Sequence, residues 1–210
     1  SSPRRVASRI SGSMSNPAAC YGLVLAGGKS RRMGQDKASL SHGGLSQLEF
    51  VFNLMAGVTD KQFVSTSEAQ RNDELRAGFP QIVDRYEDLG PIAGILSALE
   101  TYPEADWLVV ACDLPNLDEN TLGELLANAP QDQPFTAYRS SRDGLPEPLC
   151  AVYRANSVAI LRRFVDEGIK CPRKVLLRSD AHLLDLPQPA ALDNINTRED
   201  LARSVLKAAG

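Results

Sequence analysis

Residues 21–37 read Tyr-Gly-Leu-Val-Leu-Ala-Gly-Gly-Lys-Ser-Arg-Arg-Met-Gly-Gln-Asp-Lys. The first part, Tyr21–Ala26, is an apolar run with the length of a buried strand, and the glycine pair that follows it is typical of a turn. Farther along, apolar residues recur at positions 48, 51, 52 and 55, which is the spacing of one helical face. The stretch therefore predicts a buried strand, a glycine-rich loop and then a helix over 45–57.

The rest of the chain continues this alternation of strand-like and helix-like segments. Strands that alternate with helices of about ten residues or more build βαβ units with right-handed crossovers. We therefore expect an α/β fold: a Rossmann-like, mainly parallel sheet with helices on both faces. Either Asp118 or Asn120 is expected to cap one of the helices. The expected further strands are 62–66, 82–83, 107–112, 134–138, 149–153 and 183–186, and the expected further helices are 90–102, 118–128, 155–167, 173–178 and 197–208.

Length and composition indicate one globular domain. The chain has 210 residues, of which 43% are hydrophobic and 23% charged, and no apolar run approaches the ~18 residues of a membrane helix. The formal net charge of −3 gives no basic field of the kind that binds nucleic acid. The four cysteines form no Cys-x-x-Cys pair, which argues against a zinc site or a disulfide framework. We expect a reduced, cytoplasmic protein that binds neither nucleic acid nor membrane.

The first 13 residues differ in composition from the rest. Ser1–Ser13 contains five serines, three arginines and no acidic residue, and Met14 follows it. A leader or an expression remnant is the favoured interpretation, with a disordered tail as the alternative. We expect the folded domain to occupy 14–210. Without those three arginines the chain has 20 basic and 26 acidic residues, so a local cluster of cations stands out.

The loop over 27–37 is such a cluster, with three glycines and four cations. Adjacent glycines can bring several backbone N–H donors to one ligand, and arginine and lysine neutralise phosphate charge. Neither G-x-x-x-x-G-K-[ST] nor G-x-G-x-x-G occurs, because five residues separate Gly28 from Gly34 and Gln35 follows. A loop that binds a phosphate or nucleotide is favoured, and a solvated basic turn is the alternative.

Two aspartates directly follow expected strands. Ligands of open α/β sheets bind outside the carboxyl ends of the strands, so Asp84 and Asp113 are candidate site residues together with 26–37. A carboxylate such as Asp113 can bind Mg²⁺, which prefers oxygen ligands and is commonly shared with substrate phosphates. The alternatives are a helix-cap or turn aspartate at 113 and a solvent-exposed strand-end aspartate at 84.

Several segments together resemble a known family. They are Leu-Ala-Gly-Gly-x-Ser-x-Arg-Met-Gly-x-Asp-Lys at 25–37, Asp84, Gly-Pro-Ile-Ala-Gly at 90–94, Ala-Cys-Asp-Leu-Pro at 111–115 and Asp-Asn-Ile-Asn-Thr-Arg-Glu-Asp-Leu at 193–201. In this order they resemble the molybdenum cofactor guanylyltransferases, which have a fold like that of the nucleotide-diphospho-sugar transferases. The first motif alone identifies only that wider superfamily.

The resemblance implies a nucleotide site. It places nucleotide contacts at Leu25, Ala26, Gly27, Gly28, Lys37, Ser65, Asp84 and Asp113. It makes Lys37, Arg32 and Asp113 the catalytic residues, with Asp113 binding Mg²⁺. The Asp84 carboxylate would read guanine, since it can accept hydrogen bonds from both N1–H and the 2-amino group. Ser65 stands where the family has an asparagine, so one amide is missing from the expected base contact.

The resemblance also implies an acceptor side. Asn194 and Asn196 would face the acceptor near the metal, although asparagines are also common at helix caps and turns. Glu147-Pro148 and 170–174 occupy the region of the family's acceptor pocket, where the insertion of Cys171-Pro172 departs from the usual basic pattern. The two histidines, His42 and His182, lie in polar surroundings and are given no role.

The implied reaction is Mg²⁺-dependent transfer of GMP from GTP to molybdopterin, with release of pyrophosphate. A phosphate acceptor is already ionised near neutral pH, which fits a candidate site without a catalytic His, Cys or Ser. A cytidylyltransferase, a sugar- or alditol-phosphate nucleotidyltransferase and an inactive nucleotide-binding module are the alternatives. Leu-Ala-Gly-Gly favours GTP, because the cytidylyltransferase relatives resemble Leu-Ala-Ala-Gly. Other proteins of molybdenum cofactor biosynthesis are expected partners.

Overall fold

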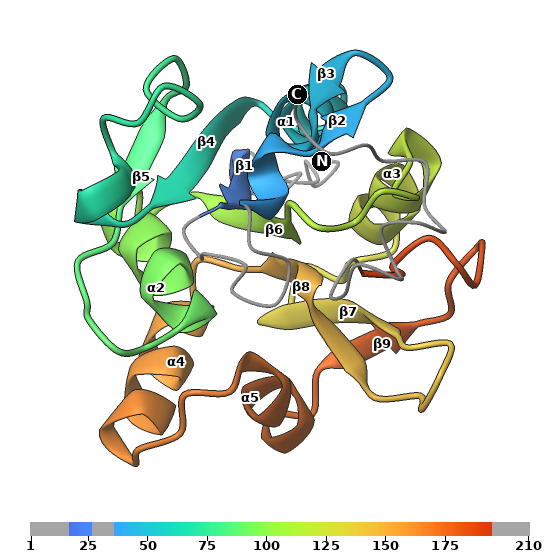
Figure 1. Cartoon of the computed structure of the whole chain (residues 1–210). Coiled ribbons are helices and arrows are strands. Elements are labelled where there is room, and N and C mark those ends of the chain that lie inside the picture. Colours follow the sequence, from blue (N-terminus) through green and yellow to red (C-terminus); the bar gives the residue numbers. More distant parts are fainter. Residues whose placement is uncertain (1–16, 27–35, 195–210) are drawn as a thin grey trace, which may run out of the picture.

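The computed structural model describes residues 17–26 and 36–194, and a seven-stranded sheet runs through this part of the chain (Figure 1). The strands lie in the order β5-β4-β1-β6-β8-β7-β9. Neighbouring strands are parallel except where β8 pairs with β6 and β7, so the sheet is mixed but mostly parallel. The strands are β1 Cys20–Leu25, β4 Lys61–Thr66, β5 Gln81–Val83, β6 Asp106–Ala111, β7 Phe135–Arg139, β8 Pro146–Tyr153 and β9 His182–Leu184.

Five helices of the described part cover the two faces of this sheet (Figure 1). One face packs against α2 (Pro91–Thr101), α4 (Ser157–Asp166) and α5 (Pro172–Arg178). The other face packs against α1 (Gln47–Ala56) and α3 (Glu119–Ala127). Every residue of β6 is buried, because a strand covered on both faces has no side open to solvent. The predicted α/β fold with helices on both faces is confirmed.

The helix predicted over 45–57 begins two residues later than expected. Leu45 and Ser46 form the short strand β3 (Leu45–Ser46), which pairs with β2 (Ser41–His42) in a small hairpin. The Ser46 hydroxyl then accepts a hydrogen bond from the backbone N–H of Glu49 at 3.1 Å, which is the geometry of a helix N-cap. The hairpin was not predicted, because two-residue strands are too short to show an alternating pattern.

Two further boundaries are fixed by the structure. Of the two proposed caps, Asp118 is the N-cap of α3, and its Oδ1 accepts from the backbone N–H of Thr121 at 2.7 Å. Strand β8 begins at Pro146, three residues before the predicted start, so Glu147 lies on a strand. Short 3-10 turns at Lys37–Ser39 (η1) and Glu68–Gln70 (η2) were not predicted.

Some expectations fall outside the described residues, namely the leader over 1–13 and the terminal helix over 197–208. Within 17–26 and 36–194, no helix has both the length and the apolarity needed to span a membrane. The four cysteines, all within these ranges, are free thiols, as the spacing predicted.

The strand ends bring distant parts of the chain together. In the parallel register, Leu25 at the end of β1 pairs with Ser65 of β4 on one side and Ala111 of β6 on the other. Asp84 directly follows β5, and Asp113 follows β6 by two residues. Because these four strands run in the same direction, their carboxyl ends form one edge, where a ligand site is expected.

Candidate active site

A large cavity lies at this edge of the sheet. Its volume is about 1130 Å³, somewhat more than the roughly 300–1,000 Å³ of most small-molecule sites. Its walls include the ends of β1, β4 and β6, the loop after β5, and the start of α2. The predicted residues that line it are Leu25, Ala26, Lys37, Ser65, Asp84 and Asp113. Gly27, Gly28, Arg32 and Asn196 lie outside the described residues.

Lys37 and Asp113 meet in this cavity. The Lys37 Nζ lies 3.1 Å from the Asp113 Oδ2, and the two side chains are 19% and 17% exposed. Lys37 is the first residue of η1, and Asp36 caps this turn by accepting a hydrogen bond from the backbone N–H of Ala38 at 3.1 Å. The fold therefore places a cation and a carboxylate, 76 positions apart in the sequence, at one point where phosphates and a divalent cation could be held together.

Asp84 and Ser65 form a second polar pair in the cavity. The Ser65 hydroxyl donates to the Asp84 Oδ1 at 3.2 Å, and the backbone N–H of Asp84 donates to the carbonyl of Thr66 at 2.8 Å. The pKa of the Asp84 carboxyl is raised above its ordinary value, because the effect of burial outweighs the hydrogen bond from Ser65, which lowers the pKa. A partly desolvated carboxylate of this kind is stabilised by a ligand that offers N–H donors.

The motif at 90–94 allows α2 to start beside the strand ends. Gly90 has a φ of 55°, which a residue with a side chain adopts only with strain, and Pro91 begins the helix where proline is favoured. A Cβ on Gly94 would lie 2.3 Å from the Ser65 Oγ and 3.1 Å from the Leu25 Cδ2. The absence of a side chain at Gly94 therefore lets the helix approach Ser65 without disturbing its bond to Asp84.

The substitution Gly94→Ala should lower stability, although alanine favours a helix more than glycine does. The new methyl group would force Ser65 to rotate away from Asp84, and such overpacking costs about 1–3 kcal/mol. The control is Gly123→Ala in α3, where a Cβ meets nothing within 4 Å and should stabilise by roughly 0.5–1 kcal/mol. Thermal unfolding of the two variants should shift the midpoint in opposite directions, and equal upward shifts would show that Gly94 has no packing role.

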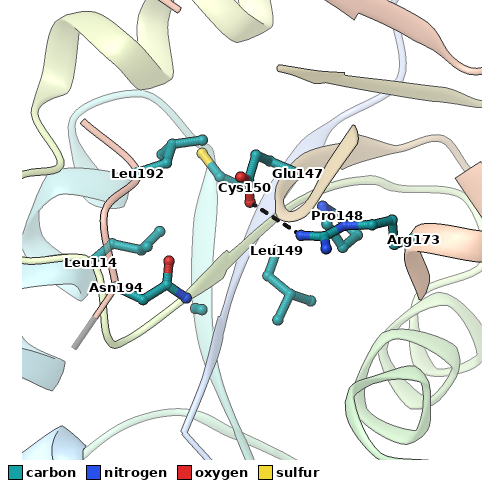
Figure 2. Close-up of a pocket in the computed structure, with 9 residues that line it drawn as sticks. Leu114, Glu147, Pro148, Leu149, Cys150, Arg173, Leu192 and Asn194 are labelled. Atoms are coloured by element: carbon teal, nitrogen blue, oxygen red, sulfur yellow. Dashed lines mark ion pairs between the residues drawn. The ribbon is translucent and has the colours of Figure 1, made fainter. Parts of the chain in front are cut away.

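A smaller pocket is shown in Figure 2. Its volume is about 90 Å³, and it shares Ala111 and Leu149 with the large cavity. The Arg173 Nη2 lies 3.9 Å from the Glu147 Oε2, and the Arg173 Nε donates to the carbonyl of Pro146 at 3.1 Å. The pKa of the Glu147 carboxyl is raised above its ordinary value, because the effect of burial outweighs the hydrogen bond from Ser140 and the charge of Arg173, which both lower the pKa. Asn194 also lines this pocket, so three residues from the segments predicted for the acceptor side lie together.

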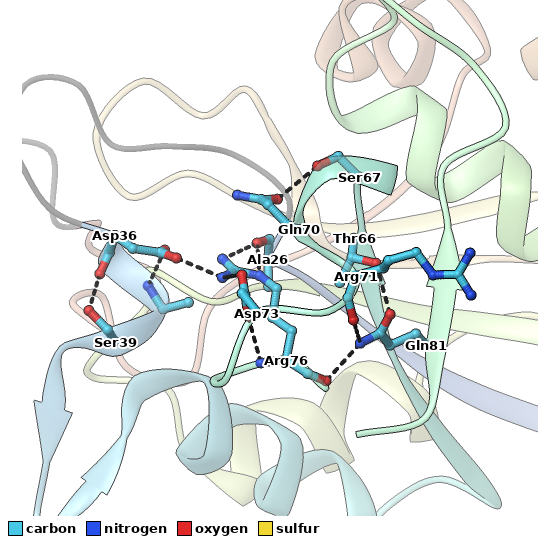
Figure 3. A network of polar contacts seen from close by, with 11 residues as sticks. Ala26, Asp36, Ser39, Thr66, Ser67, Gln70, Arg71, Asp73, Arg76 and Gln81 are labelled. Atoms are coloured by element: carbon cyan, nitrogen blue, oxygen red, sulfur yellow. Dashed lines mark hydrogen bonds and ion pairs between the residues drawn. The ribbon is translucent and has the colours of Figure 1, made fainter. Parts of the chain in front are cut away.

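Arg76 was missed by the sequence analysis. Its side chain is only 1% exposed, and its guanidinium contacts Asp36, Asp73 and the carbonyl of Ala26 (Figure 3). Burial alone would lower the pKa of Arg76, but the hydrogen bonds and charges of Asp36 and Asp73 outweigh it and raise the pKa. An arginine in a polar segment gives no sequence signal that it will be buried, so only the tertiary structure could have identified it.

His42 also contributes more than its polar sequence context indicated. Its ring stacks on Phe50 with centroids 3.7 Å apart, and its Nε2 donates to the carbonyl of Pro115 at 3.0 Å. This contact ties the small hairpin to the segment that follows Asp113. The role that these contacts indicate is structural support of the site.

Comparison with known proteins identifies the family. Residues 22–183 match the family described as the MobA-like NTP transferase domain. The chain belongs to this family. A MobA-like relative from Nostoc sp., named "Probable molybdenum cofactor guanylyltransferase", is 34% identical over 183 residues, which cover 86% of this chain and 87% of the relative. The predicted membership and the predicted nucleotidyltransferase class are therefore confirmed.

Two further matches define how far the MobA-like likeness extends. A Synechocystis sp. relative named "Molybdenum cofactor biosynthesis bifunctional protein" is 37% identical over 180 residues, which cover 86% of this chain and 52% of the relative. This chain thus spans about half the length of that protein. The crystal structure of "Molybdopterin-guanine dinucleotide biosynthesis protein A" from Archaeoglobus fulgidus has a TM-score of 0.68, covering 87% of this chain and 95% of that chain. At 24% identity this likeness shows that the fold is shared.

Proposed function

We propose that this chain transfers GMP from GTP to a molybdopterin-type molybdenum cofactor and releases pyrophosphate. The observation that carries the proposal is the cavity at the strand ends, where Asp84, Lys37 and Asp113 line one space. It is supported by the family match and by relatives named as molybdenum cofactor guanylyltransferases. The proposal includes a cytoplasmic location and contacts with the proteins that supply the acceptor and use the product.

The nucleotide would lie along the carboxyl ends of the strands. Its guanine would be next to Asp84 and Ser65 after β5 and β4, and its phosphates would be next to Lys37 and Asp113 after β1 and β6. The end of β1 and the start of α2 also line the cavity. In this orientation a half-buried carboxylate meets the N–H donors of the base, and a lysine meets the anionic phosphates.

The reaction needs positioning and charge neutralisation more than it needs a base. A phosphate oxygen of the acceptor forms a bond to the α-phosphorus, the bond from that phosphorus to the bridging oxygen breaks, and the electron pair leaves with pyrophosphate. A phosphate monoester, whose second pKa is about 6, is already ionised near neutral pH, so no side chain has to remove a proton. Lys37 would hold the phosphates in line for the attack and stabilise the charge that develops on them.

The carboxylates of the cavity fit Mg²⁺. Within the described residues no three His, Cys, Asp or Glu side chains gather as a complete metal cage. Mg²⁺ is usually held by one or two carboxylates together with substrate phosphates and water, and Asp113 and Asp36 both line the cavity. Asp113 would bind the ion, with Asp36 nearby. When bound, Mg²⁺ neutralises the charge of the triphosphate and of the leaving pyrophosphate.

The acceptor would lie on the side of the smaller pocket. That pocket shares two wall residues with the nucleotide cavity, and Glu147, Arg173 and Asn194 line it. Arg173 offers donors to an anion, and Glu147 offers an acceptor to ring N–H groups. The Cys171-Pro172 insertion forms the start of α5, with Pro172 as its first residue. The acceptor-side role of Asn196, like the catalytic role of Arg32, remains a prediction from the sequence.

The nucleobase preference tests the proposal. GTP should bind about ten- to a hundredfold more tightly than ATP, because adenine lacks the N1–H and 2-amino donors and would leave the Asp84 carboxylate without hydrogen bonds from the base. Asp84→Asn should reduce this preference, mainly by weakening the binding of GTP. Titration of GTP, ATP and CTP with Mg²⁺ present measures both effects.

The matched control is Asp88→Asn. Asp88 is an exposed aspartate that lines the same cavity, and asparagine tolerates its φ of 57°. This control should keep the full GTP preference. A wild-type preference for CTP would replace the proposal with a cytidylyltransferase. A GTP preference that survives in Asp84→Asn would instead reject Asp84 as the residue that reads guanine.

A further inference from the structure

The buried guanidinium of Arg76 joins two points that are distant in the sequence. Its Nε donates to the carbonyl of Ala26 at 2.8 Å, at the end of β1, and its Nη1 lies 2.7 Å from the Asp36 Oδ2 (Figure 3). The same Nη1 lies 2.8 Å from the Asp73 Oδ2. One side chain thus ties the residue after β1 to the residue before Lys37.

The backbone of Arg76 is itself fixed to the sheet. Gln81, the first residue of β5, donates through its Nε2 to the carbonyls of Arg76 and Arg71, each at 2.8 Å (Figure 3). The Asp73 Oδ1 accepts from the backbone N–H of Arg76 at 2.8 Å. The guanidinium is therefore held in place by its backbone as well as by its charged partners.

Asp36 connects the Arg76 guanidinium to Lys37. One oxygen of its carboxylate takes the ion pair with Arg76, and the other accepts the backbone N–H of Ala38, which caps the turn that begins at Lys37. The carbonyl of Asp36 also accepts from the Ser39 hydroxyl at 2.7 Å. With Asp36 held on both sides, the Lys37 side chain reaches Asp113 at 3.1 Å.

We propose that Arg76 is a positioning residue for the transfer reaction, which holds Asp36 so that Lys37 is directed to Asp113 and the triphosphate. This inference rests on the proposed function. Arginine suits the task because its planar fork reaches a carbonyl and two carboxylates at once, which a lysine ammonium does not do with the same fixed geometry. If Arg76 served only to stabilise the fold, loss of Asp36 would not change the position of Lys37 more than loss of Asp73.

The test compares Asp36→Asn with Asp73→Asn. Each variant removes one charged partner of the same guanidinium and keeps an oxygen for the backbone N–H that the aspartate caps. Only Asp36 is linked to Lys37. The first readout needs no nucleotide: the Lys37 ε-amine is acylated by a water-soluble reagent, and the rate is followed by mass spectrometry.

Lys37 released from Asp113 should be acylated about tenfold faster in Asp36→Asn than in the wild type, the change expected from loss of one charge-assisted contact. In Asp73→Asn the acylation rate of Lys37 should stay within about twofold of the wild-type rate. Asp36→Glu keeps the charge but moves the carboxylate by one methylene group, and it should also release Lys37. Equal rates in Asp36→Asn and Asp73→Asn, or a wild-type rate in Asp36→Glu, would overturn the proposal.

The second readout is kcat/KM for GTP. Asp36→Asn and Arg76→Lys should each lower it by about ten- to a hundredfold, whereas Asp73→Asn should lower it little. In a Lys37→Ala background Asp36→Asn should add almost nothing, because both changes remove the same contact. Fully additive losses would show that Asp36 acts independently of Lys37.

These experiments distinguish failure of the proposed function from failure of the positioning role proposed for Arg76. A wild-type protein that does not turn over GTP would reject the proposed function, while the acylation rates still decide whether Arg76 positions Lys37. Thermal unfolding of each variant shows whether it is folded. If Arg76→Lys does not fold, the Asp36 and Asp73 pair carries the test alone.

Discussion

Replacing Asp113 with alanine should abolish Mg²⁺-dependent release of pyrophosphate. The carboxylate lies just beyond β6, lines the large cavity and faces Lys37. Loss of its charge would remove the oxygen proposed to bind Mg²⁺ and several kcal/mol of transition-state stabilisation, so turnover should fall by about a thousandfold or more. A coupled assay for pyrophosphate with GTP and the molybdopterin acceptor measures this loss.

The control for this experiment is Asp118→Ala. Asp118 is the N-cap of α3 and does not line the cavity, so its loss should lower stability by about 1 kcal/mol and leave turnover nearly unchanged. Asp113→Ala should show the opposite pattern, with a small shift in the unfolding midpoint. Turnover near that of the wild type in Asp113→Ala would reject the metal assignment. Unfolding of that variant would instead favour the turn-aspartate interpretation.

Replacing Lys37 with alanine should weaken triphosphate binding and slow turnover together. Its ammonium is placed by η1 beside Asp113, where the phosphates would lie. Removal of one charge-assisted contact in a partly buried site costs about 1.5–3 kcal/mol, or roughly ten- to a hundredfold in kcat/KM. Titration of GTP and steady-state kinetics at fixed ionic strength measure the two effects.

Lys61→Ala is the matched control for Lys37→Ala. Lys61 is an exposed lysine at the first residue of β4, at the opposite end of that strand from Ser65. Its removal changes the net charge by the same amount and should change kcat/KM little. Equal losses in the two variants that disappear at high salt would indicate a general electrostatic field and not a positioned contact.

The elements predicted best are those with a strong local pattern. Strand β6 lies within one residue of its predicted bounds, because a strand covered on both faces is a continuous apolar run. The hairpin at 41–46 and the two 3-10 turns were missed, since segments of two or three residues have no periodicity. The start of β8 was missed as well, because its first residues, from Pro146, read as part of the preceding turn.

The sequence by itself determined the alternation of strands and helices, and with it the edge of the sheet where Asp84, Lys37 and Asp113 were expected. Hydrophobic periodicity is a local property, so it can be read directly from the sequence. Only the tertiary structure decided that Lys37 pairs with Asp113, that Ser65 donates to Asp84 and that Arg76 is buried between Asp36 and Asp73. These contacts join residues from different segments, and the burial that makes a charged side chain informative exists only after the chain has packed.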